Sequence, residues 1–422
     1  MIEIVNRNQI TTVPGIEQNN IDQYAIVKEI IAGVKQRGDN ALFEFTEKFD
    51  KVVLSNLLVS DTEIEEAYEN IDPQVIDAIK SAIKNIREYH EKQTRSSWIT
   101  PSDTGTLLGQ LILPLERVGI YVPGGTASYP TSVLMNAIPA QVAGVKDIAM
   151  VTPIGKNGKL SPGVLVAAQE LGIKEIYKIG GAHAVAALAY GTQTIKKVDK
   201  ITGPGNIFVA LAKREVSGVV DIDMIAGPSE VVILADEYAR ADYIAADLLA
   251  QAEHDMMASV ILVTPSYHLA DEVRKELDKQ LPTLHRKSIA EVALNNLGKI
   301  CLVDDLEEAF EVVNLLAPEH LEVMIPNPLE HIGKIKNAGA IFLGENSPVA
   351  VGDYFAGPNH VLPTNGTARF SSPLNVDDFQ KKSSLVCYSK QEIKKHGHKI
   401  ISLAEHEGLQ AHAQSVKIRL ND

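Results

Sequence analysis

The sequence predicts a protein of the α/β class with two parallel-sheet domains, a helical N-terminal segment and a small C-terminal tail. Three observations predict this class. From about residue 117 to 343, short apolar runs alternate with glycine turns and helical stretches, a pattern typical of βαβ units around parallel sheets. The first hundred residues follow helical spacing instead. The last fifty are too few for a domain of their own.

The N-terminal segment reads as a series of helices. We expect one helix to be capped by Asp61, because acidic residues follow it in what would be the first turn. Asp72-Pro73 predicts the start of another, since proline is favoured at the first helical position. The apolar side chains after Pro73 recur at helical spacing, and the pattern ends near Trp98.

Two sets of alternating elements follow. In the first we expect strands at 117–122, 147–152 and 175–179, and helices at 131–143, 163–171 and 182–190. In the second we expect strands at 230–235, 259–264, 299–303 and 340–343, and helices at 239–254 and 271–281, the latter capped by Asp271. A last helix is predicted at 389–406, which Gly397 could interrupt.

These elements predict a division of the chain. The pattern alone leaves open whether one domain is inserted in the other or simply follows it. We take the inserted arrangement, in which residues 1–115 and 230–375 form a discontinuous first α/β domain. Residues 116–229 then form the second, and residues 376–422 form the tail.

Composition excludes several classes of function. The formal net charge of −14 would repel nucleic acid, and no basic block offsets it. No apolar stretch approaches the ~20 residues of a membrane span, and Met1 to Ile10 do not resemble a signal peptide. Two cysteines cannot form a disulfide framework. We therefore expect a cytoplasmic protein with no nucleic-acid or membrane partner.

Four separated pieces of the sequence carry residues suited to chemistry. They are Ala250-Gln-Ala-Glu-His254, Ala317-Pro-Glu-His320, Gly352-Asp-Tyr354 with Asn359-His360, and Glu405-His-Glu-Gly-Leu-Gln-Ala-His412. Taken singly each piece is weak evidence, because a histidine near a glutamate is usually a solvated pair. Their order along one chain is far more specific.

In this order the pieces resemble the histidinol dehydrogenase family, as do Tyr121-Val-Pro-Gly-Gly, Gly203-Pro-Gly-Asn and Ala226-Gly-Pro-Ser-Glu. The resemblance runs from about residue 20 to the end. It implies two incomplete Rossmann-like parallel-sheet domains. It also implies an NAD-dependent four-electron oxidation of L-histidinol through L-histidinaldehyde to L-histidine, the last steps of histidine biosynthesis.

The resemblance further implies one Zn²⁺ per subunit, held by Gln251, His254, Asp353 and His412. Zinc binds imidazole nitrogen and carboxylate oxygen readily. Because zinc has no redox role, it can only hold the substrate and polarise it. His412 would come from the partner subunit. The resemblance therefore implies a homodimer with exchanged C-terminal tails.

Glu319 and His320 are the expected acid–base pair. Oxidation of an alcohol releases a hydroxyl proton, and a histidine with a pKa near neutrality can accept it. The resemblance assigns activation of water, needed for the second oxidation, to Glu319. An ordinary surface pair at a helix start is the alternative interpretation.

The resemblance also implies substrate contacts. They fall on Ser229, Gln251, His254, His320, Asp353, His360, Glu407 and His412. The carboxylate of Glu407 suits a cationic amine or imidazole, whereas Ser229 lies in a turn and is equally suited to cap a helix.

The expected NAD contacts are Tyr121, Asn206 and His183. The residues themselves say little, because Gly203-Pro-Gly-Asn-Ile-Phe lacks the third glycine of a dinucleotide-binding fingerprint. Glycine turns before helices can hold a diphosphate on bare backbone N–H groups. The family commonly has glutamine where this chain has His183, a residue that can still form hydrogen bonds.

Cys301 and Cys387 are predicted to be structural, because neither has the cationic neighbourhood that lowers a thiol pKa. Two other functions remain open. One is a related dehydrogenase acting on another primary alcohol, such as a sulfonated diol; Glu407 and His412 favour histidinol. The other is a zinc hydrolase, which would act without NAD.

Overall fold

The computed structural model describes residues 2–10, 21–124, 129–225 and 227–421. Two residues of the motifs above, Gly125 and Ala226, lie outside the described residues. The chain divides into two compact units. The larger comprises Met1–Gln93 and Glu116–Phe379, and the smaller Thr94–Leu115 and Gln380–Asp422.

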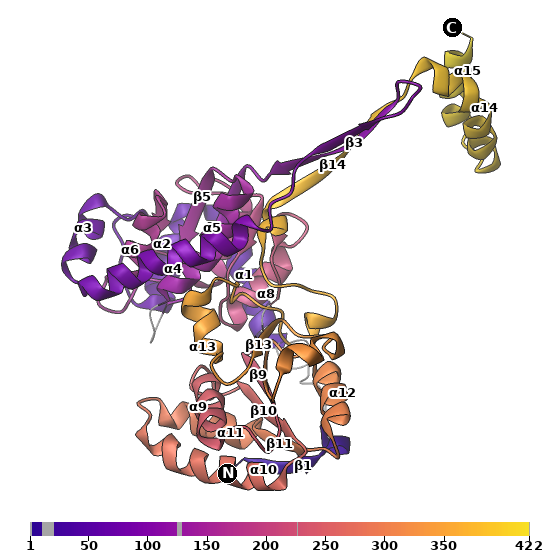
Figure 1. Cartoon of the computed structure of the whole chain (residues 1–422). Coiled ribbons are helices and arrows are strands. Elements are labelled where there is room, and N and C mark those ends of the chain that lie inside the picture. The colour runs from indigo at the N-terminus through magenta and orange to yellow at the C-terminus, as the bar shows by residue number, and fades with distance from the viewer. Residues whose placement is uncertain (1, 11–20, 125–128, 226, 422) are drawn as a thin grey trace. The chain divides into compact units, whose positions relative to one another are not determined.

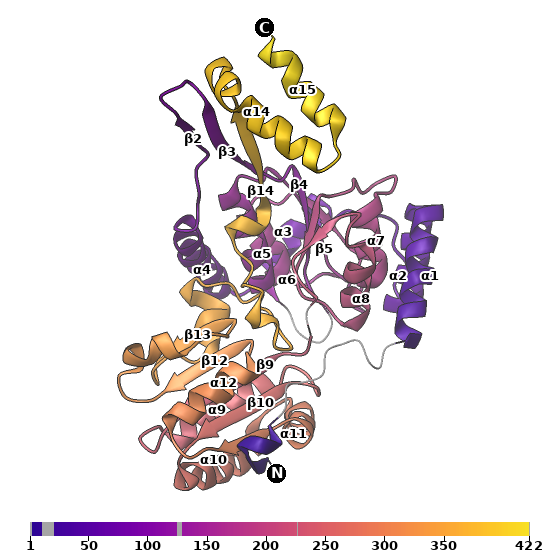
Figure 2. The same cartoon turned by 90° about the vertical axis from the view of Figure 1, so that its right-hand side faces the viewer.

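A five-stranded parallel sheet forms from residues 117–222 (Figure 2). Its strands are β4 (Arg117–Tyr121), β5 (Asp147–Val151), β6 (Glu175–Tyr177), β7 (Lys200–Thr202) and β8 (Asp221–Ile222). Their spatial order is β6-β5-β4-β7-β8, which is the order of an incomplete Rossmann fold. The helices between them are α5 (Pro130–Ala143), α6 (Pro162–Glu170), α7 (Gly181–Tyr190) and α8 (Ile207–Val216).

A six-stranded parallel sheet forms from the second set of elements. Its strands are β1 (Glu3–Asn6), β9 (Glu230–Ala235), β10 (Ser259–Thr264), β11 (Lys299–Leu302), β12 (His320–Met324) and β13 (Ala340–Leu343). The order is β1-β11-β10-β9-β12-β13, so the last five strands repeat the arrangement of the first sheet. The predicted fold class, with two incomplete Rossmann-like sheets, is confirmed.

Helices cover both faces of the six-stranded sheet. They are α9 (Ala241–Ala252), α10 (Tyr267–Gln280), α11 (Lys287–Asn296) and α12 (Leu306–Leu316). Successive side chains of β9 point to opposite faces: Val231 packs in the cluster of α9, α10 and α11, whereas Val232 packs in that of α12. Burial on both faces explains why these strands are continuous apolar runs.

The N-terminal helices are α1 (Ile21–Arg37), α2 (Asp39–Asp50), α3 (Asp61–Glu69) and α4 (Pro73–Glu91). Their apolar side chains pack on the helices of the five-stranded sheet, where α1 and α2 share a core with α7 and α8. This differs from the predicted division, which grouped 1–115 with 230–375; of that segment only β1 joins the six-stranded sheet. Helical spacing shows that a helix has an apolar face but not which sheet covers it.

Two predicted helix details change in the structure, and a third is confirmed. Ser60, not Asp61, caps α3, and it forms a capping box with Glu63. Helix α10 begins at Tyr267 with Ser266 as its cap, four residues before the predicted Asp271. The predicted start of α4 is confirmed, since Asp72 accepts a hydrogen bond from the backbone N–H of Gln74 and proline follows.

The smaller unit contains an antiparallel sheet and two helices (Figure 1). Its elements are β2 (Trp98–Pro101), β3 (Leu107–Pro114), β14 (Gln380–Cys387), α14 (Lys390–His406) and α15 (Gln410–Leu420). Helix α14 continues through Gly397, where an interruption was predicted. A Cβ there would press on Leu420 and Val416, so glycine permits the two helices to pack closely.

Among the described residues, no helix is long and apolar enough to cross a membrane.

Candidate active site

Glu319 and His320 lie at the amino edge of the six-stranded sheet. Helix α12 ends at Leu316, and Ala317 takes a left-handed conformation with φ 49° that turns the chain back. Glu319 follows, and His320 is the first residue of β12. The carbonyl oxygen of Glu319 accepts a hydrogen bond from the N–H of Ala340 at 2.9 Å, which ties the turn to β13. The pair is therefore buried at a strand start, not exposed at a helix start.

The backbone of Glu230, the first residue of β9, holds both side chains. Its N–H donates to Glu319 Oε2 at 2.8 Å, and its carbonyl oxygen accepts a hydrogen bond from His320 Nδ1 at 3.0 Å. Because a carbonyl only accepts, Nδ1 carries a proton, and in the neutral ring the lone pair is on Nε2. The ring is thus oriented with its basic nitrogen free.

His320 Nε2 lies 3.5 Å from Asp353 Oδ1 and has no hydrogen-bond partner in the described part of the chain. Burial alone would lower the pKa of His320, but the nearby negative charges of Glu319 and Asp353 raise it well above its usual value. The charge of Asp353 acts on His320 in full only while Asp353 is not bound to a metal.

Asp353 lies among three histidines. It belongs to a π-helical turn, η5 (Gly352–Ala356), that directly follows α13 (Val349–Val351); such turns are frequent at functional sites. Burial would raise its pKa, but the nearby His320, followed by the charges of His360 and His254, lowers it. The carbonyl oxygen of Asp353 also accepts a hydrogen bond from His360 Nδ1 at 3.0 Å.

Gln251 and His254 lie at the end of α9, which stops at Ala252. The N–H of His254 donates to the carbonyl oxygen of Gln251 at 3.2 Å, and the His254 side chain is exposed. Gln251 is only 3% exposed.

These residues fit a zinc ion by the chemistry of their donors. An imidazole and a carboxylate of lowered pKa are groups that zinc binds readily, and a buried amide can add a neutral oxygen ligand. Within the described residues, no group of three or more His, Cys, Asp or Glu side chains is arranged to hold a metal. The ligand set expected from the sequence contains Gln251, which is not one of these residue types, and His412, which belongs to the smaller unit.

The remaining predicted substrate residues lie in two places. Ser229 directly precedes β9, half-buried, and its carbonyl oxygen accepts a hydrogen bond from the N–H of Ser259 at 3.0 Å. The alternative interpretation was that Ser229 caps a helix, but it precedes a strand instead. Glu407 and His412 belong to the smaller unit, at the end of α14 and in the first turn of α15, and both are exposed.

Helix α4 supports the site through residues that no motif indicated. His90 is fully buried; its Nδ1 donates to Gln93 Oε1 at 3.0 Å, and its Nε2 faces the amide nitrogen of Asn359 at 3.4 Å. That amide also donates to the carbonyl oxygen of Met135 at 2.6 Å. Asn359 directly precedes His360, so α4 and α5 together fix that histidine.

His90 gives a pH dependence of stability. Burial lowers its pKa to about 4, although the hydrogen bond to Gln93 raises it somewhat. Below pH 6.5 the unfolded chain takes up a proton that the folded chain refuses, so stability falls as the pH drops from 6.5 to 4. The free-energy advantage of wild type over His90→Gln should shrink by about 3 kcal/mol across this window, measured by urea unfolding. An advantage that does not change with pH would contradict this role, and His268→Gln, exposed on α10, is the control.

Tyr121 and Asn206 lie at the carboxyl ends of β4 and β7, where the strand order reverses. In open α/β sheets this is where nucleotides bind. The hydroxyl of Tyr121 accepts a hydrogen bond from the N–H of Gly181 at 3.0 Å, and Asn206 caps α8. Gly203, with φ 112°, passes so close to the Tyr121 carbonyl that no larger residue fits. Two glycine turns, at Gly181 and Gly203, thus contact Tyr121 at this edge.

His183 lies in the first turn of α7, two residues after Gly181. It is 1% exposed and packs against the rings of Phe45 and Phe49 of α2. Burial lowers its pKa to about 3, and its Nδ1 has no partner among the described residues. This differs from the predicted NAD contact, because neither ring nitrogen is exposed to a nucleotide.

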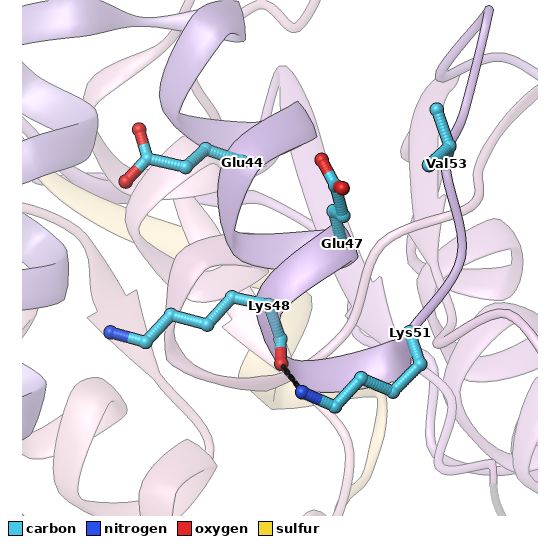
Figure 3. A pocket seen from close by; sticks show the side chains of 5 residues that line it. All are labelled: Glu44, Glu47, Lys48, Lys51 and Val53. Carbon is cyan, nitrogen blue, oxygen red and sulfur yellow. Dashed lines mark hydrogen bonds between the residues drawn. The ribbon is translucent and has the colours of Figure 1, made fainter.

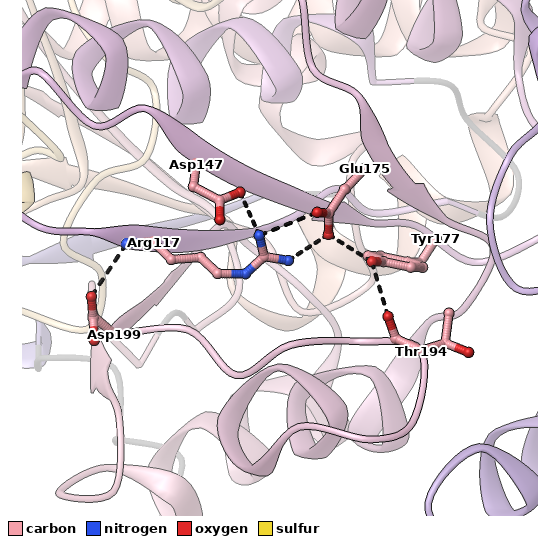
Figure 4. A network of polar contacts seen from close by, with 6 residues as sticks. All are labelled: Arg117, Asp147, Glu175, Tyr177, Thr194 and Asp199. Atoms are coloured by element: carbon pink, nitrogen blue, oxygen red, sulfur yellow. Dashed lines mark hydrogen bonds and ion pairs between the residues drawn. The ribbon is translucent and has the colours of Figure 1, made fainter.

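Other polar groups of the larger unit are structural. At the amino edge of the five-stranded sheet, Arg117 bridges Asp147 and Glu175, and Tyr177 donates to Glu175 at 2.6 Å (Figure 4). This edge is opposite to the one with the glycine turns. A hollow at the end of α2 is lined by Glu44, Glu47, Lys48, Lys51 and Val53 (Figure 3). It contains none of the predicted site residues.

The two cysteines differ in environment. Cys301 is buried in β11, where burial raises the pKa of its thiol to about 11. Cys387 is exposed at the end of β14. The high pKa of Cys301 disfavours the thiolate that a nucleophile requires.

Comparison with known proteins identifies the family. The family model described as histidinol dehydrogenase matches residues 15–420. Histidinol dehydrogenase of Geobacillus kaustophilus is 59% identical over 405 residues, which are 96% of this chain and 96% of that protein. That of Bacillus subtilis is 59% identical over 404 residues, 96% of this chain and 95% of that protein. The crystal structure of histidinol dehydrogenase from Elizabethkingia anophelis has a TM-score of 0.94 and 39% identity, and covers 100% of this chain and 98% of that one.

A match over nearly the whole chain agrees with the buried Glu319–His320 pair, the histidines around Asp353 and the two Rossmann-like sheets. The chain belongs to the histidinol dehydrogenase family.

Proposed function

We propose that this chain is an NAD-dependent L-histidinol dehydrogenase, which oxidises L-histidinol through L-histidinaldehyde to L-histidine in the last steps of histidine biosynthesis. Membership of the family supports oxidation of L-histidinol over oxidation of another primary alcohol and over hydrolysis. The observation that carries the proposal is the orientation of His320, whose Nδ1 hydrogen bond to Glu230 leaves Nε2 free beside Asp353.

His320 would act as the base in both oxidations. Its Nε2 takes the hydroxyl proton of the alcohol while a hydride is transferred to NAD from the carbon that bears this hydroxyl. The imidazolium that results is stabilised by Glu319, whose Oε2 lies 3.5 Å from Nδ1. Before the second oxidation the aldehyde must gain a water. Glu319 is proposed to activate that water, with His320 again taking up a proton.

We further propose that Gln251, His254 and Asp353 hold one Zn²⁺ together with His412, which the partner subunit supplies in a homodimer with exchanged tails. When bound, the ion would hold and polarise the substrate. Ser229, His360 and Glu407 complete the substrate contacts, together with the four metal ligands and His320. The burial of Gln251 at the end of α9, three residues before His254, supports this assignment.

NAD is proposed to bind where Tyr121 and Asn206 meet, at the reversal of strand order. His183 is not included among these contacts, because the core under α2 buries it. We also propose a cytoplasmic location, which the exposed free thiol of Cys387 supports.

Removal of metal tests the proposed zinc site. Dialysis against a chelator should abolish NADH formation from L-histidinol, and Zn²⁺ should restore it, while far-UV circular dichroism stays unchanged. Calcium is the matched control, since it prefers six to eight oxygen ligands and should not restore activity. Full activity in protein shown to be metal-free would contradict the site.

A further inference from the structure

Two neighbouring carboxyl groups, the buried Glu322 and the half-buried Asp247, belong to elements that also carry residues of the proposed site. Glu322 is 1% exposed on β12 and comes two residues after His320. Alternate side chains of a strand share a face, so Glu322 and His320 point to the same side of the sheet. Glu322 Oε1 accepts a hydrogen bond from the N–H of Val349 at 2.8 Å. Val349 begins α13, which leads directly to Asp353.

The second carboxyl group belongs to α9. Asp247 is one helical turn before Gln251, and residues at this spacing share a face of a helix. The carboxyl groups of Asp247 and Glu322 lie within reach of a hydrogen bond, and each acts on the pKa of the other. The pair therefore connects α9, β12 and α13, the elements that carry or lead to Gln251, His320 and Asp353.

Such a bond requires one proton between the two groups. Glu322 Oε2 is buried and has no hydrogen-bond partner among the described residues. If both carboxyls were ionised, neither could donate, whereas a proton on one of them would let it donate to the other. Burial, followed by the charge of Asp247, raises the pKa of Glu322, and burial raises that of Asp247. Like charges in a buried site favour retention of one proton by the pair.

We propose that Asp247 and Glu322 share one proton and act as positioning residues that fix α9 against β12 and α13. The inference rests on the proposed function. In it, the pair keeps Gln251, His254, Asp353 and His320 at the distances from one another that the proposed site requires. Neither carboxyl touches the substrate. Partners outside the ligand shell commonly change metal affinity by about 10- to 100-fold, and small displacements of a site are costly.

Two substitutions of Glu322 separate the shared proton from simple packing. In Glu322→Gln, the amide oxygen can still accept from Val349 and the amide nitrogen can donate to Asp247, so every hydrogen bond is retained. In Glu322→Leu, the volume is similar but both bonds are lost and Asp247 has no partner. The readout is the Kd of the full-length protein for Zn²⁺, measured by competition with a chromophoric chelator, together with kcat and KM.

We expect Glu322→Leu to bind Zn²⁺ about 10- to 100-fold more weakly, at a temperature where thermal unfolding shows that it is folded. Glu322→Gln should bind within about three-fold of wild type and restore kcat. Asp247→Ala tests the same bond from the other side, and replaces the leucine variant if that one does not fold. Asp242→Ala, which changes an aspartate of the same helix whose side chain is 43% exposed, should leave the Kd unchanged.

Wild-type affinity in both Glu322→Leu and Asp247→Ala would overturn the proposal. A Glu322→Gln protein that binds Zn²⁺ as weakly as Glu322→Leu would also overturn it. The affinity for Zn²⁺ would then depend on the charge of Glu322 and not on the shared proton. These outcomes concern the variants alone. Wild-type protein that binds no Zn²⁺ would instead contradict the proposed metal site, and this inference with it.

Discussion

Replacing His320 by asparagine is expected to lower kcat about 10²- to 10⁴-fold, the range that a general base contributes. Asparagine offers no basic nitrogen, whereas His320 has a free Nε2 because Glu230 holds its Nδ1 proton. KM for L-histidinol should change little, and bound zinc should remain, since His320 is not among the proposed ligands. Initial rates of NADH formation and the zinc content of the same protein give both quantities.

The matched control is His268→Asn, the same substitution at an exposed position on α10, which should keep wild-type kcat. A His320→Asn protein with kcat within a few-fold of wild type would exclude His320 as the base. If the variant lost zinc as well as activity, the role of His320 would be in metal binding instead.

Mixing two inactive variants is expected to recover activity if the tails are exchanged. His320 belongs to the larger unit and His412 to the smaller one. In a heterodimer of His320→Asn and His412→Asn, exchanged tails place both defects in one site and leave the other intact. Random mixing makes half of the dimers heterodimers, so activity should reach about a quarter of wild type.

A control mixture shows whether recovery requires the tail. Glu319→Gln and His320→Asn alter two residues of the same unit, so every site of their heterodimer contains a defect and no activity should return. If native mass spectrometry demonstrates mixed dimers of His320→Asn and His412→Asn but activity stays absent, each subunit uses its own tail.

The sequence predicted the sheets where the strands are long apolar runs between turns. The strand at 259–264 coincides with β10, and that at 147–152 with β5 to within one residue. It missed β12, because His320-Leu-Glu-Val-Met alternates charged and apolar residues although every one of them is buried. It missed β1 because four residues pair only at the sheet edge. The antiparallel strands β3 and β14 lie far apart in sequence, and no local pattern joins them.

In the candidate site, too, some residues could be predicted from the sequence and others could not. Glu319, His320 and Asp353 stand out by their motifs, and the structure places them together. Glu230 acts through its backbone N–H and carbonyl, which any residue possesses, so its identity gives no signal. His90, Asp247 and Glu322 depend on burial between elements, which spacing along the chain does not show. His183 was interpreted from its place in a glycine turn, yet the packing of α2 decides its environment.

The stoichiometry of NADH formed from limiting L-histidinol tests the central claim most directly. Two NADH per L-histidinol, with L-histidine as product and no free aldehyde, is the predicted result. One NADH per substrate with released aldehyde would contradict the two-step assignment to Glu319 and His320. No NADH from folded, zinc-loaded protein would show that the site oxidises an alcohol without an imidazole.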